Sequence, residues 1–172
     1  MTEGQETTRQ WQQWLGRHGP AMLLVARQIV PASADAEDVV QAAFVRFWTT
    51  RGRAADPVAY LFACVRSAAL DWRRAGARRG RREEAAARSD SPAAPAALFT
   101  ARMEHEERRG AIEAALAKLP EPQREVLVMK VWAKLSFPQI AEALGIPPDT
   151  AASRYRYALD KLRGELAEEL IR

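Results

Sequence analysis

The sequence contains a single cysteine, Cys64, in 172 residues. A lone cysteine cannot form a disulfide within the chain. It also leaves no Cys/His spacing typical of a zinc site, because the two histidines, His18 and His105, lie far apart. Cys64 falls inside an apolar helical pattern and is expected to be a small core residue. We therefore expect neither a metal nor a cofactor.

Long hydrophobic runs are also missing. Residues 1–13 are polar and do not resemble a signal peptide. The apolar patches are all much shorter than the roughly 20 residues that a helix needs to cross a bilayer. We expect no membrane insertion and a cytoplasmic location.

Patterns typical of catalysis are missing as well. The sequence has no glycine-rich phosphate loop and no Ser/His/Asp set with supporting context. It also lacks any useful length of the apolar–polar alternation that marks β-strands. These absences favour an all-α protein that is not an enzyme, and they leave binding as the expected activity.

Basic residues are plentiful but unevenly distributed. The formal net charge of +4 is modest, yet between Arg66 and Arg82 seven arginines accompany one acid, Asp71. A clustered basic stripe attracts a phosphate backbone, and the neighbouring Tyr60 and Trp72 could stack on unpaired bases. Another interpretation stays open, because charge runs are often solvated helix faces and Trp72 also fits the buried period.

The chain is expected to fold as two small helical domains joined by a flexible linker. We predict a polar tail at 1–10, an N-terminal helical domain at 11–82, a linker at 83–104 and a C-terminal domain at 105–172. The linker is rich in alanine, serine and proline without apolar periodicity, which is typical of an extended tether. Apolar residues make up 48% of the sequence, enough for a core.

Three helices are expected in the N-terminal domain. The first covers about residues 11–30 and stops near Pro31. The second starts at Asp35, whose carboxylate can cap free N–H groups. The third opens at Asp56 and Pro57, an N-cap followed by proline at the first helical position. Two glycines near the end of this third helix are expected to weaken it there.

The C-terminal domain contains the most specific local pattern, that of a helix-turn-helix. Ser136 and Gln139 form a capping-box pattern, Gly145 supplies a left-handed stop, and a proline pair forces a turn before a last helix at about 149–170. A helix-turn-helix places its second helix in the DNA major groove. The alternative is an ordinary αα-hairpin with a solvated, charged face.

Polar side chains cover the side of this last helix that is opposite its apolar positions. Ser153, Arg156 and Tyr157 lie on this face, and Arg154 borders it. Serine, arginine and tyrosine near the N-terminal half of a recognition helix suit contacts with base edges and phosphates. We expect this face to contact DNA.

Acidic residues cluster at the start of the second expected helix. Asp35, Glu37 and Asp38 are followed one turn later by Gln41, and the other side of this helix is apolar. Compensation of the helix dipole explains the cluster without any partner. The functional interpretation is a docking face for a basic partner.

The two halves together resemble the extracytoplasmic-function (ECF) sigma factors of bacterial RNA polymerase, within the sigma-70 superfamily. Residues 35–48 (DAEDVVQAAFVRFW) are similar to that family's D-A-E-D-x-x-Q-x-x-F-x-x-x-W helix. Residues 56–74 (DPVAYLFACVRSAALDWRR) are similar to its promoter-melting and −10 segment. Residues 119–127 (LPEPQREVL) and the helix-turn-helix resemble its −35-binding domain. The order and separation of these motifs make the set specific.

The resemblance implies a DNA-binding sigma factor that joins core RNA polymerase at its clamp and flap regions and directs promoter-specific transcription initiation. The implied polymerase-binding residues are Asp35, Glu37, Asp38, Gln41 and Trp48. Those implied for the −10 element are Tyr60, Arg66, Ser67, Arg73, Arg74 and Arg78. Those implied for the −35 element are Thr150, Ser153, Arg154, Arg156 and Tyr157. The family commonly uses an anti-sigma protein as a further partner.

Three positions depart from the family pattern. Tyr60 stands where tryptophan is frequent, Ser67 where asparagine is usual, and Ala152 where a basic residue is common. The main alternative function is a dimeric helix-turn-helix regulator that acts without being a polymerase subunit. It predicts a dimer face in the first half and tight DNA binding without polymerase. A helical adaptor predicts instead that Arg73, Arg74 and Arg156 can be replaced by alanine without consequence.

Overall fold

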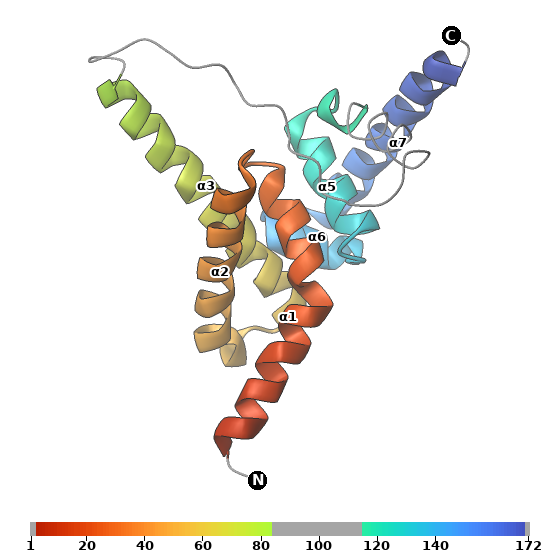
Figure 1. Cartoon of the computed structure of the whole chain (residues 1–172). Helices are drawn as coiled ribbons and strands as arrows, with labels where there is room; N and C mark the ends of the chain where they lie inside the picture. The colour runs from red at the N-terminus through yellow and green to blue at the C-terminus, as the bar shows by residue number, and fades with distance from the viewer. Residues whose placement is uncertain (1–2, 84–114, 171–172) are drawn as a thin grey trace.

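All regular structure in the described part of the chain is helical (Figure 1). The computed structural model describes residues 3–83 and 115–170. The helices are α1 (Glu3–Arg27), α2 (Ser33–Thr50), the short 3₁₀ helix η1 (Arg51–Arg53), α3 (Pro57–Glu83), α5 (Glu121–Val131), α6 (Phe137–Leu144) and α7 (Pro148–Leu170). The all-α prediction is confirmed. The predicted linker at 83–104 falls almost entirely outside the described residues, so the domain boundaries stay predictions.

Helix α1 differs from its predicted bounds at both ends. The polar tail predicted at 1–10 is helical from Glu3 onward, and the helix ends at Arg27, before the predicted stop near Pro31. Polarity alone does not end a helix, because glutamate, glutamine and arginine are good helix formers. Early glutamates also favour the positive end of the helix dipole.

Helix α2 starts two residues earlier than predicted. Its N-cap is Ala32, which makes no side-chain hydrogen bond, so the prediction that Asp35 caps the helix is wrong. Asp35 lies in the first turn instead, where its carboxylate still interacts favourably with the helix dipole. The apolar side of α2 is fully buried at Phe44 and Phe47.

Helix α3 begins as the sequence predicts. The Asp56 carboxylate accepts hydrogen bonds from the backbone N–H groups of Val58 (2.9 Å) and Ala59 (3.0 Å). The helix then continues to Glu83, past both glycines that were expected to weaken it. The alanines and arginines around those glycines are strong helix formers, which favours the longer helix.

The helix-turn-helix prediction is confirmed in its local geometry. The Gln139 N–H donates to Ser136 Oγ at 3.3 Å, and the Ser136 N–H donates to Gln139 Oε1 at 2.9 Å, which is a complete capping box. Gly145 has φ 66° and ψ 40°, the left-handed conformation that ends α6. Helix α7 then starts at Pro148, where proline is well tolerated.

The two halves pack against each other, which the sequence patterns do not indicate. One continuous cluster of buried residues includes Phe44 and Val65 of the N-terminal half together with Val126, Met129 and Ile140 of the C-terminal half. Helix α3 packs on α6, and α1 packs on α5. In Figure 1 the ends of α3 and α7 project from this shared body in different directions. The halves are therefore in direct contact in this conformation.

Two features were expected to be missing, a membrane-spanning helix and a metal site. Residues 3–83 and 115–170 can be compared with both expectations. No helix in these ranges has the length and apolar character needed to cross a membrane. The same ranges bring no three metal-binding side chains together. Cys64 is buried, as predicted, and burial raises the pKa of its thiol.

Replacing Asp56 with alanine is expected to destabilise the fold by about 1 kcal/mol, the usual cost of losing an N-cap. The first turn of α3 loses its acceptor, and Gln139 Nε2 loses a hydrogen bond of 2.9 Å to Asp56 Oδ2. Urea unfolding of the wild type and of Asp56→Ala at pH 7 measures this difference.

The same pair of proteins tests the charge state of Asp56. The hydrogen bond from the Ala59 N–H, together with those from Gln139 and Val58, holds the pKa of this carboxyl below its ordinary value of 3.8. A lowered carboxyl pKa stabilises the fold above the unfolded-state value, and this contribution disappears as the pH falls through the folded-state pKa. The two proteins should therefore converge in stability below pH 3.8. An unchanged gap across this range would contradict the assignment.

Gly145→Ala is expected to destabilise the protein by about 1 kcal/mol, because alanine disfavours a positive φ. Gly164→Ala is the matched control. A Cβ added at Gly164, inside α7, meets no atom within 4 Å. This second change should stabilise by up to about 1 kcal/mol. Thermal unfolding of both variants measures the two opposite shifts, and equal shifts would contradict the role of Gly145 as a helix stop.

Candidate nucleic-acid interface

Helix α3 presents part of its arginine stripe to solvent. Arg73 and Arg74 are exposed, while Arg66 and Ser67 are half-buried. Arg74 Nη1 pairs with Asp71 Oδ1 at 2.9 Å on the same helix. Arg78 is another −10 candidate on this helix. Its backbone lies within α3, but its side chain lies outside the described residues.

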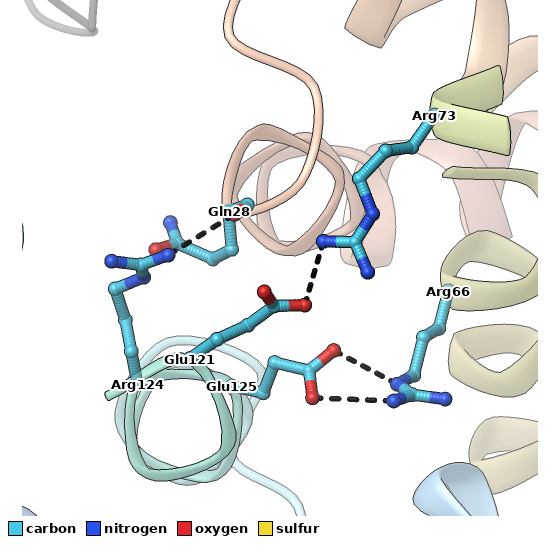
Figure 2. A network of polar contacts seen from close by, with 6 residues as sticks. All are labelled: Gln28, Arg66, Arg73, Glu121, Arg124 and Glu125. Atoms are coloured by element: carbon cyan, nitrogen blue, oxygen red, sulfur yellow. Dashed lines mark hydrogen bonds and ion pairs between the residues drawn. The ribbon is translucent and has the colours of Figure 1, made fainter. Parts of the chain in front are cut away.

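Two arginines of the stripe are bound by carboxylates from the other half of the chain (Figure 2). Arg66 Nε lies 2.8 Å from Glu125 Oε1, and Arg66 Nη2 lies 3.4 Å from Glu125 Oε2. Arg73 Nη1 lies 2.8 Å from Glu121 Oε1. Arginine presents the same fork of N–H groups to carboxylates and to phosphates. Both side chains are thus already placed to bind anions.

The two ion pairs differ in their surroundings. The Glu125 side chain is only 5% exposed, and its partner Arg66 is 28% exposed. The Arg73 and Glu121 side chains are 47% and 38% exposed, so water and salt screen that pair. The Arg66–Glu125 pair therefore depends far more on the two halves staying together.

Aromatic residues near the stripe contribute to packing in this conformation. The hydroxyl groups of Tyr60 and Thr50 lie 3.0 Å apart in a hydrogen bond, and the Tyr60 ring centroid is 6.3 Å from that of Phe47. Trp72 packs partly buried against the core. The structure therefore supports the core interpretation of Trp72, and the −10 role of Tyr60 stays a prediction.

Helix α7 has the two-sided character that the sequence predicts. Ala151 and Ala158 are fully buried, whereas Arg156 and Tyr157 are exposed on the other side. The Arg156 guanidinium lies 5.5 Å from the centre of the Tyr157 ring, which is 55% exposed. The other three −35 candidates on this helix are half-buried: Thr150, Ser153 and Arg154. Their contact with DNA stays a prediction.

The acidic cluster of α2 lies mostly at the surface. Glu37, Asp38 and Gln41 are exposed, and Asp35 is half-buried. Beside them on α2 lies Val45, an apolar side chain that is 54% exposed. An acidic and apolar surface of this kind can dock a basic partner that also offers apolar contact.

Trp48, the fifth polymerase-binding candidate, belongs largely to the packed core. Its ring lies 5.2 Å from that of Trp11 in an edge-on arrangement. The Arg51 guanidinium covers the ring at 3.6 Å from its centre. Trp48 therefore helps to position α2, and its direct contact with a partner stays a prediction.

Several polar residues between the halves were not anticipated from the sequence. Besides Glu121 and Glu125, Arg124 Nη2 donates to the backbone carbonyl of Gln28 at 3.4 Å (Figure 2). Gln139 Nε2 also donates to the capping residue Asp56. One sequence feature could have indicated that Glu125 is buried, namely its position directly before the apolar run 126–129. A buried charge there requires a partner, but the sequence does not say which one.

Fold and surfaces together define a helical DNA-binding protein of two halves, one with an arginine stripe beside an acidic helix and one with a helix-turn-helix. Residues 14–79 match the family model for Sigma-70 region 2, and residues 109–162 match that for Sigma-70, region 4. These matches place both motif groups in one family and in the expected order.

Curated relatives agree with the family models. The RNA polymerase sigma-E factor of Streptomyces coelicolor is 31% identical over 162 residues, which cover 91% of this chain and 86% of that relative. The ECF RNA polymerase sigma factor SigL of Mycobacterium tuberculosis is 31% identical over 155 residues, covering 88% and 85%. The chain belongs to the sigma-70 family, as an ECF RNA polymerase sigma factor. This membership decides against the dimeric regulator considered from the sequence.

Solved structures show the same fold. CnrH in complex with the cytosolic domain of CnrY superposes with a TM-score of 0.63 and 25% identity, covering 94% of this chain and 90% of that one. The sigma factor RpoE in complex with the anti-sigma factor NepR, from Bartonella quintana, has a TM-score of 0.67 at 21% identity, covering 92% and 98%.

Proposed function

We propose that the chain directs core RNA polymerase to promoters by reading two DNA elements with its two halves. The arginine stripe of α3 meets the −10 element, and the exposed face of α7 meets the −35 element. The observation that most supports this division is that each half has its own arginine-bearing surface, on α3 and on α7. In this function the chain is a non-catalytic factor that works in the cytoplasm.

Joining two halves of low DNA affinity on one polymerase strengthens the binding of both to a promoter. Contacts to phosphates lose affinity steeply as salt rises, so neither half alone holds a promoter well. Once both halves are attached to the polymerase, the second contact becomes intramolecular and gains effective concentration. Extruding a base near −10 costs a few kcal/mol, which stacking and pocket contacts offset.

Helix α2 is the proposed polymerase-docking element. Its exposed acids Glu37 and Asp38, with Gln41 one turn on, lie beside the exposed Val45. Charges at such a rim guide association and orient the partners. An anti-sigma protein is a further proposed partner, since one structural relative was solved with such a protein.

Arg156→Ala is expected to reduce −35-dependent initiation by about tenfold, in line with 1–3 kcal/mol for one arginine contact to a base. Its side chain is exposed, so the fold and polymerase binding should not change. The measurement is in vitro transcription with core polymerase on a promoter identified by mapping transcript starts after overexpression. Arg163→Ala, a 77%-exposed arginine two turns further along α7, is the matched control. Equal loss in both variants would place the −35 contact elsewhere.

Asp38→Arg is expected to weaken the complex with core polymerase by about tenfold, because it reverses one charge in the proposed docking face. Titration of labelled protein with core polymerase in the absence of DNA measures this affinity. Asp71→Arg makes the same charge change at an exposed acid of α3 and should leave the affinity unchanged. If wild-type protein and core polymerase do not co-purify, the proposed function itself is wrong.

A further inference from the structure

Lys134, in the turn between α5 and α6, has an unusual backbone conformation. Its φ of 58° is the one positive value of a non-glycine residue in the part of the chain that the structure describes. Residues other than glycine are disfavoured in this left-handed region, because their Cβ comes too close to the following carbonyl oxygen. Such outliers concentrate at functional sites, where a side chain is retained although its backbone is strained. The turn alone therefore gives no reason for a lysine at this position.

The residues around Lys134 fix this conformation. The Leu135 N–H donates to the backbone carbonyl of Met129 at 3.2 Å, and the Leu135 side chain is fully buried. Lys130 Nζ donates to the Leu135 carbonyl at 3.0 Å and lies 4.7 Å from the centre of the Phe137 ring. A change to negative φ at Lys134 would disturb these contacts. The strain is therefore set by the buried side of the turn.

The side chain of Lys134 lies at the surface, next to the helix-turn-helix. It is exposed, and none of the ion pairs formed within residues 3–83 and 115–170 includes it. Ser136, two residues further on, is the N-cap of α6, the first helix of this motif. In helix-turn-helix proteins the first helix crosses the DNA backbone while the second lies in the major groove. Lys134 thus directly precedes the helix that is expected to cross the phosphates.

Helix α7 offers little free positive charge to these phosphates. Lys161 donates to the backbone carbonyl of Lys118 at 3.0 Å, and Arg163 Nη1 lies 3.5 Å from Asp160 Oδ1. Asp149 adds an exposed negative charge at the start of the same helix. The sequence-independent part of DNA affinity depends on how many phosphates lysine and arginine neutralise. A lysine on the neighbouring turn raises this number.

We propose that Lys134 is a phosphate-binding residue of the −35 half, retained for its charge in spite of its unfavourable backbone conformation. This inference rests on the proposed −35 role of α7. The ammonium group contacts one DNA phosphate beside α6, and this contact carries no sequence information. Arg156 reads the bases, and Lys134 fixes the position of the helix-turn-helix on the duplex.

Lys134→Gly tests the proposal, because folding and DNA binding should respond in opposite directions. Glycine adopts a positive φ without a steric penalty, so the melting temperature should rise by about 2 °C. The slope of log affinity for DNA against log salt should become less steep by about 0.9, the contribution of one phosphate contact. This corresponds to about eightfold weaker binding at about 0.1 M salt if both proteins bind equally at about 1 M.

The affinity is measured by fluorescence anisotropy. A labelled promoter duplex, chosen by mapping transcript starts, is titrated at several salt concentrations with the complex of the chain and core polymerase. A second duplex carries an altered −35 element. Lys134→Gly should weaken binding to both duplexes equally, whereas Arg156→Ala should weaken mainly the unaltered one. A wild-type salt slope for Lys134→Gly would overturn the proposal.

Two matched controls accompany this variant, Lys134→Arg and Arg163→Gln. The first keeps the charge and the left-handed backbone, so it should keep the salt slope and the melting temperature of the wild type. The second removes a positive charge from a 77%-exposed residue of the same half and should leave the salt slope unchanged. If Arg163→Gln reduces the slope as much as Lys134→Gly does, general charge explains the effect and the proposal is wrong.

The same measurements distinguish this proposal from the proposed function. If Arg156→Ala loses affinity while Lys134→Gly does not, the role of Lys134 is wrong and the −35 role of α7 stands. Wild-type affinity in both variants shows that the −35 role itself has failed. If Lys134→Gly binds core polymerase more weakly in the absence of DNA, the lysine contacts a protein surface instead, and the proposal is again overturned.

Discussion

The contact between α3 and the C-terminal half is the constraint on which the rest of this structure depends. It joins apolar residues of both halves into one core and places Glu125 of α5 against Arg66 of α3. The same contact brings the capping residues of two helices together, because Gln139 closes the capping box of α6 and also donates to Asp56 at the start of α3. Residues at the starts of α3 and α6 thus help to hold the two halves in one body.

The ion pair at this contact contributes more to specificity than to stability. A buried ion pair adds little net stability, because desolvation of both charges offsets most of their attraction. It does make this packing specific, since a packing that buried Glu125 away from Arg66 would leave a buried carboxylate without a cation. If the pair separates, each ion can find another partner. Water can hydrate the carboxylate, and phosphates can bind the guanidinium.

Local structure was well predicted by the sequence because it is governed by neighbouring residues. The caps at Asp56 and Ser136 and the left-handed Gly145 follow from short-range hydrogen bonding and steric limits. The predictions for the start of α2 and both ends of α1 were wrong, because several residues there can begin or extend a helix. The packing of the two halves could not be predicted, since it depends on shape complementarity between distant segments. For the same reason Glu121 and Glu125 were missed, although the arginines that they bind were selected.

The proposed recognition of two promoter elements requires that the two halves, which are in contact in this structure, move apart when the chain functions with polymerase. Fluorescence energy transfer between dyes on Arg46→Cys in α2 and Arg163→Cys in α7 measures this directly, because both positions are exposed and Cys64 is buried. High transfer in the free chain that falls on addition of core polymerase and promoter DNA is the predicted result. Unchanged high transfer in a complex that actively initiates transcription would contradict the account.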